Sequence, residues 1–144
     1  MTLPIDRDSE SYKFYKTLNE DVLLKPNEYN EWDIQMENGD YKNVDGFESL
    51  KNAICIAIMT RFGELQTSPI YNQFGCRVHE LIKINKSSMV VYKIELFVTE
   101  VLAKMRRIQS INWVEITEDT NFSYNISFSV YSITDELIEG SVKI

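Results

Sequence analysis

Apolar side chains recur at helical spacing in the segment 47–62, where five of them lie three or four residues apart: Phe47, Leu50, Ile54, Ile58 and Phe62. This spacing predicts a helix with one face in a core. Asp45 and Glu48 fit a capping box at its start, and Gly63 fits a stop at its end. Because 53–59 is apolar nearly all round, we expect this helix to be central and buried.

A second long helix is predicted over 88–107, after a loop at 64–76 and a short helix at 77–84. Ser87 or Ser88 can cap its first turn. Its apolar stripe consists of Val91, Ile94, Val98, Val101, Leu102 and Met105. Its predicted last turn holds three cations, which the helix dipole favours there: Lys104, Arg106 and Arg107.

The pattern changes to a period of two in the C-terminal third of the chain. Over 121–131 apolar residues alternate strictly with Ser and Asn; the apolar ones are Phe122, Tyr124, Ile126, Phe128 and Val130. Alternation of this kind predicts a strand with one buried face. Further strands are predicted at 111–117 and 137–143. Two main helices packed on a small antiparallel C-terminal sheet form an α+β domain.

The N-terminal segment 1–30 is polar and weakly patterned, and it contains Pro4 and Pro26. We expect an extended arm that lies on its own chain or on a neighbour. The α+β domain is then expected over 31–144. It would open with a short strand at 32–36 and a turn at 38–40, where Asn and Gly tolerate positive φ.

Charge and composition exclude several classes of function. The formal net charge of −7 disfavours nucleic-acid binding, which needs a dense basic surface. No run approaches the ~20 apolar residues of a membrane span, and the N-terminus resembles no export signal, so we expect synthesis in a cytoplasm. Cys55 and Cys76 lack a CxxC spacing and His79 is the sole histidine, so we expect no metal site, no cofactor and no disulfide.

Catalytic motifs are absent from the sequence: it has no GxSxG, no P-loop and no GxGxxG. A triad would have to use His79, which reads as a residue of a short helix. Glu64 could serve as the acid of a cell-wall glycosidase, although the spacing marks no second carboxylate. Its structural alternative is to cap a loop or to pair with an arginine. Arg106 and Arg107 are either solvated cations or anchors for a carboxylate or for backbone carbonyls.

The last predicted strand, 137–143, is expected at a sheet edge. The unpaired N–H and C=O groups of an edge can be completed by a strand from another chain. Charged side chains can instead guard such an edge, and Glu136, Glu139 and Lys143 could do so here. Both possibilities stay open from the sequence.

The order of motifs in the middle of the chain carries a resemblance. The run DGFESLKNAICIAIMTRFGELQTSPIYNQFGCRVHELI has a glycine before a helix, Thr-x-x-Gly-Glu at its end, and then a proline and a glycine in a loop; these are Gly46, Thr60, Gly63, Glu64, Pro69 and Gly75. It resembles the GPW/gp25-like family of phage baseplate wedge proteins. In the later stretch MRRIQSINWVEI, Arg107 and Ile108 match the family's Glu-Pro-Arg-Ile, whereas Met105 and Arg106 replace its Glu and Pro.

The resemblance implies a structural subunit, not an enzyme, in the baseplate of a contractile phage tail. Such a sheath initiator would share β-strands with the first sheath ring, in multiple copies around a ring assembled in the host cytoplasm. Its partners would be the tail sheath protein and other wedge and tail-tube proteins. A lysozyme-like glycosidase and an adaptor in a bacterial injection machine are the alternatives. Partner contacts are expected at Gly63, Glu64, Arg106, Arg107, Phe122, Tyr124, Ile126, Phe128, Leu137, Ile138 and Val142.

Overall fold

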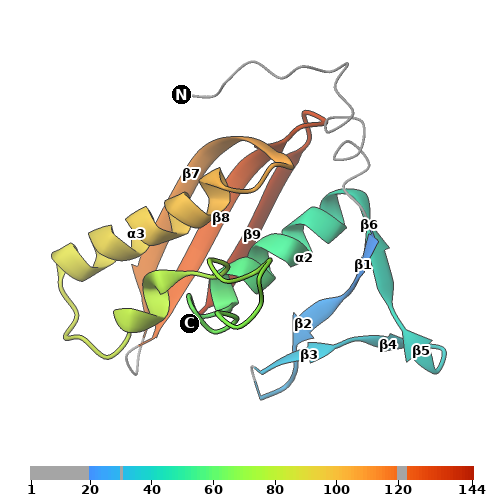
Figure 1. Cartoon of the computed structure of the whole chain (residues 1–144), viewed down its shortest axis with the longest axis horizontal. Helices are drawn as coiled ribbons and strands as arrows, with labels where there is room; N and C mark the ends of the chain where they lie inside the picture. The colour runs from blue at the N-terminus through green and yellow to red at the C-terminus, as the bar shows by residue number, and fades with distance from the viewer. Residues whose placement is uncertain (1–19, 30, 120–122) are drawn as a thin grey trace.

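Two helices cover one face of a three-stranded antiparallel sheet, and a β-ribbon lies beside the first helix (Figure 1). This computed structural model describes residues 20–29, 31–119 and 123–144. The predicted α+β class is confirmed. Within the described ranges, no helix combines the length and the apolar composition that a membrane span requires.

The ribbon is formed by the segment that precedes the first helix. Three short antiparallel pairings build it: β1 (Glu20–Val22) with β6 (Asn43–Asp45), β2 (Leu24–Pro26) with β3 (Trp32–Ile34), and β4 (Met36–Glu37) with β5 (Asp40–Tyr41). The predicted turn is confirmed, because Asn38 and Gly39 have φ values of 53° and 82°, as in tight hairpin turns. Residues 20–26 thus pair with residues C-terminal to 30, whereas residues 1–19 of the predicted arm lie outside the described ranges.

One buried side chain ties the ribbon to the first helix. The amide oxygen of Asn52 accepts a hydrogen bond from Leu24 N at 3.0 Å, and its Nδ2 donates to Val22 O at 3.0 Å and to Asp21 Oδ2 at 3.2 Å. Asn52 is only 4% exposed. Since a buried amide without partners is costly, these bonds fix where the ribbon lies.

The first helix, α2 (Gly46–Met59), starts and ends differently from the prediction. The Asp45 side chain makes no capping hydrogen bond, so the predicted capping box is wrong. The helix ends at Met59 rather than at Phe62, because the next residues pair with a distant segment. Cys76 N donates to Thr60 O at 2.8 Å, and Phe62 N donates to Cys76 O at 3.2 Å.

The second helix, α3 (Ser88–Ala103), is also shorter than predicted. Ser87 Oγ accepts from Val90 N at 3.3 Å, which confirms the predicted cap. Before it, the predicted helix at 77–84 is only a 3₁₀ turn, η1 (Arg77–Glu80). After Ala103 two successive tight turns lead into the sheet, so Arg106 and Arg107 follow the helix and do not belong to its last turn. The prediction that placed them in its last turn is wrong.

The sheet consists of β7 (Ile108–Glu118), β8 (Tyr124–Ser132) and β9 (Leu137–Lys143), with β8 in the middle. All three predicted strands are therefore confirmed. On the core face α3 packs on β7 and α2 packs on β9 (Figure 1). Two cross-strand rows of side chains line this face: Val114–Phe128–Gly140 and Ile116–Ile126–Val142. β9 is an edge strand, as predicted.

Candidate partner-binding site

The outer edge of β9 offers backbone groups that its neighbour does not use. Tyr124 and Ile144 exchange both backbone hydrogen bonds, at 2.8 and 2.9 Å. In an antiparallel pair such doubly bonded pairs alternate along the strand. Ile138, Gly140 and Val142 therefore direct their N–H and C=O groups to β8. The groups that point away belong to Leu137, Glu139, Ser141 and Lys143, and within the described ranges no strand pairs with them.

A glycine lets α2 approach this edge strand closely. A Cβ atom on Gly140 would lie 2.8 Å from Phe128 Cζ and 2.9 Å from Lys51 Cε. The Phe128 ring thus fills the space that a side chain would need, and the Lys51 stem crosses over the strand. Lys51 of α2 is in this way held at the edge of the sheet.

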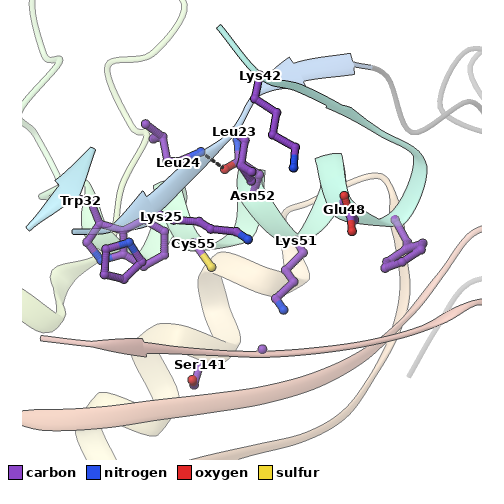
Figure 2. A pocket seen from close by; sticks show the side chains of 13 residues that line it. Leu23, Leu24, Lys25, Trp32, Lys42, Glu48, Lys51, Asn52, Cys55 and Ser141 are labelled. Atoms are coloured by element: carbon purple, nitrogen blue, oxygen red, sulfur yellow. Dashed lines mark hydrogen bonds between the residues drawn. The ribbon is translucent and has the colours of Figure 1, made fainter. Parts of the chain in front are cut away.

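A groove of about 500 Å³ lies beside the edge (Figure 2). Its walls come from the ribbon, from α2 and from Gly140 and Ser141 of β9. Leu24, Trp32 and Phe47 supply apolar surface. The charged side chains that line it are Lys25, Lys42, Lys51 and Glu48. An extended chain that paired with β9 would lie against this groove.

The cysteine of the groove is not suited to act as a nucleophile. Burial raises the pKa of the Cys55 thiol to about 11, although the nearby Lys51 ammonium acts in the opposite direction. The thiol is therefore neutral near pH 7. Cys76 is also buried with a raised pKa, and both cysteines are free thiols in this structure. Among the described residues, no group of three or more His, Cys, Asp or Glu side chains could hold a metal ion.

The motif residues after α2 build a loop. Thr60 Oγ1 donates to Ile56 O at 2.7 Å, and Glu64 Oε2 accepts from Arg61 N at 3.1 Å. Gly63 has a φ of 83°. The Glu64 carboxylate is exposed and does not line the groove. Its contact matches the structural alternative stated above, a carboxylate that caps a loop.

The single histidine has a structural contact as well. His79 Nε2 lies 3.0 Å from Ile58 O, which ties η1 to the end of α2. Desolvation lowers the pKa of the imidazole. The ring is therefore neutral near pH 7 and joins two elements of the core.

Five of the eleven sequence-predicted partner residues lie in the core of the monomer. Each of the five is at most 1% exposed: Tyr124, Ile126, Phe128, Ile138 and Val142. Leu137 is 49% exposed, and Phe122 lies outside the described residues. Arg106 is exposed, and Arg107 O accepts from Ile133 N at 3.0 Å, beside the turn between β8 and β9. The five buried side chains cannot touch a partner themselves. They position the strand backbone, and the backbone is what a partner could contact.

Sequence reasoning missed the residues of the groove. Lys25 and Lys42 lie in the ribbon, Lys51 lies on the helix, and nothing in their spacing shows that they converge. The one available signal was Gly140, since a glycine inside a strand pattern often marks a close approach.

Comparisons with known proteins identify the family and the fold. A family model described as the contractile injection system sheath initiator matches residues 23–135. A crystal structure from Geobacter sulfurreducens, named as a "putative tail lysozyme", superposes with a TM-score of 0.57 at 21% identity, over 67% of this chain and 87% of that one. At this identity the likeness shows the fold alone. A search of curated proteins gives no match. Because the family model covers most of the chain, this protein belongs to the sheath initiator family of contractile injection systems.

Proposed function

We propose that the protein is a baseplate wedge subunit of a contractile phage tail, and that it nucleates sheath assembly by accepting a strand of a sheath subunit at β9. The observation that carries this proposal is the open outer edge of β9, where Leu137, Glu139, Ser141 and Lys143 direct their backbone groups away from β8. Exposed edges are templates for strand addition. Membership of the sheath initiator family supports the sheath as the source of the strand.

The energetics favour a ring of such contacts over a single one. Each added backbone hydrogen bond contributes about 0.5–1.5 kcal/mol net. One short strand therefore only roughly offsets the entropy that association costs. Several copies in a ring hold the same sheath ring together, so each later contact forms at high effective concentration. The other partners in this proposal are wedge and tail-tube proteins of a baseplate that is assembled in the host cytoplasm.

A proline at the edge tests the proposal directly. In Glu139→Pro the lost N–H is one that points away from β8, so the internal ladder keeps its hydrogen bonds. The control Glu139→Ala removes the same side chain and keeps the N–H. We expect tails assembled with Glu139→Pro to lack sheath in electron micrographs, and tails with Glu139→Ala to carry it. Thermal melts of both purified variants would verify that they fold.

Normal sheaths on tails built with a folded Glu139→Pro variant would overturn strand addition at β9. Deleting 134–144 is a weaker test, because it also removes Ile138 and Val142 from the core. The proposed role is structural. Clearing of peptidoglycan by the purified protein, with loss of clearing in Glu64→Gln, would contradict that part of the proposal.

A further inference from the structure

Three lysines converge on the groove beside β9, in a chain whose net charge is −7. Lys25 comes from β2, Lys42 from the junction of β5 and β6, and Lys51 from α2. Figure 2 shows their side chains extending into the space between the ribbon, α2 and β9. Glu48 is the only acidic residue among those that line the groove. Its lining therefore carries three positive charges against one negative charge.

These lysines have no acidic partner within the described part of the chain. The ion pairs found there join Lys104 to Glu100 and Lys143 to Asp119. The ammonium groups of the groove lysines make no hydrogen bond or ion pair to any described residue. Three such cations on an acidic protein raise the local concentration of anions and favour a negatively charged ligand.

The groove also offers apolar surface at the same place. Phe47 is 49% exposed, and Trp32 is half-buried against the core. In an extended chain alternate side chains point to the same side. A strand on the β9 edge would therefore present one row of side chains to the groove. The lining suits a row that combines carboxylates with an apolar residue.

We propose that the groove selects an acidic extended segment of the partner protein. Its carboxylates pair with Lys25, Lys42 and Lys51, and one apolar side chain of the same row packs against Trp32 or Phe47. This inference rests on the proposed function, in that β9 receives a partner strand. It adds the chemistry of that strand and makes attachment depend on ionic strength. Each exposed pair contributes roughly a two- to fivefold gain in affinity, so reversing the three charges weakens binding at least about tenfold.

The test uses the full chain and a fluorescein-labelled nine-residue peptide with Thr at the even positions, Val at the central position and Glu at the other odd positions, so that Glu and Val lie in one row. A matched peptide carries Lys in place of Glu. Fluorescence anisotropy would compare the protein with a triple variant, Lys25→Glu, Lys42→Glu and Lys51→Glu. The control is Lys83→Glu, which reverses an exposed charge outside the groove. Circular dichroism would verify that all variants fold.

We expect the protein and Lys83→Glu to bind the Glu peptide, and the triple variant to bind it at least about tenfold more weakly. Raising the salt from 0.05 to 0.5 M should weaken binding to a similar extent, because charges at a surface are screened. Equal affinity for both peptides, or an unchanged triple variant, would overturn the proposal. So would failure of the Glu peptide to bind at low salt.

Two other occupants of the groove give different results, and each overturns the proposal of a partner strand. Salt-sensitive dimerisation of the protein alone, lost in the triple variant, would show that the groove takes a second copy. Peptide binding only after removal of residues 1–19 would show that the chain covers its own groove. The failures of the two proposals can be told apart. If the unaltered protein supports normal sheath but does not bind the Glu peptide, only the acidic strand is refuted. If the protein binds the peptide but Glu139→Pro tails still carry normal sheath, sheath nucleation at β9 is refuted.

Discussion

Replacing Gly75 by alanine should strongly destabilise the protein, although the change adds a single methyl group. Gly75 has a φ of 112°, a conformation that L-residues rarely adopt. A Cβ atom there would lie 2.7 Å from Arg61 O and 2.8 Å from Thr60 O. Both neighbours are backbone atoms, so neither can rotate away as the end of a side chain could.

The size of the effect can be worked out from these contacts. The strained φ alone costs about 1–3 kcal/mol. Relieving the clash moves residues 60–62 away from Cys76, and thus weakens the hydrogen bonds from Cys76 N to Thr60 O and from Phe62 N to Cys76 O. Each of these contributes about 1 kcal/mol. We therefore expect Gly75→Ala to lower the free energy of unfolding by about 3–5 kcal/mol, a large part of a typical domain's stability.

Gly63→Ala is the matched control, since Gly63 has a φ of 83° but no atom within 4 Å of the added Cβ. Gly63→Ala should lower the free energy of unfolding only through the strain of a positive φ, by about 1–2 kcal/mol. Urea unfolding followed by tryptophan fluorescence would measure both variants. If the two variants lower the free energy of unfolding by amounts that agree within about 0.5 kcal/mol, the clash of the added Cβ with Arg61 O and Thr60 O does not contribute, and the prediction is wrong.

Three further predictions concern the core. The pKa of Cys55 is raised from 9.0 to about 11, so the stability gained from its neutral thiol is complete below pH 9 and is lost as the pH rises towards 11. Between pH 9 and 11 the free energy of unfolding, measured with urea, should fall more steeply in the parent protein than in Cys55→Ala, by up to about 1.4 kcal/mol per pH unit. Equal slopes for the two proteins would contradict this. Because the pKa of His79 is lowered, its contribution is present above about pH 6.5 and is lost as the pH falls. Melting temperatures between pH 7 and 5 should therefore fall less in His79→Gln than in the parent, and an identical fall would refute the assignment. Ile126→Ala removes a fully buried side chain of the central strand and should cost about 2–5 kcal/mol in urea unfolding, whereas a cost below about 1 kcal/mol would mean that the core relaxes around the site.

Local patterns were sufficient to predict the main elements but not their ends. The alternation from Tyr124 to Val130 placed the central strand, because one face of that strand is buried along its whole length. The helical spacing from Phe47 onward could not show that the chain leaves α2 at Thr60. That departure depends on pairing with Cys76, a contact between segments separated by the loop. Likewise, Arg106 and Arg107 have the composition of a helix end, but the path into β7 determines where they lie.

The groove was unpredictable for a related reason. Lys25, Lys51 and Gly140 converge there from three separate parts of the sequence. Convergence of this kind follows from tertiary packing, in particular from the hydrogen bonds of Asn52 that position the ribbon on α2. No periodicity in the sequence encodes those bonds. The open edge of β9, by contrast, follows from chain order and alternation, and it was predicted.

The packing of α2 on β9 also affects how the protein is made. The helix is complete at Met59, but its partner strand begins only at Leu137. At about 5–20 residues per second, the ribosome takes on the order of 4–16 s to synthesise the intervening residues. During that delay Leu50, Ile54 and Ile58 lack the surface that buries them in the finished fold. A nascent chain that stalls within this interval therefore presents an apolar helix to chaperones and proteases.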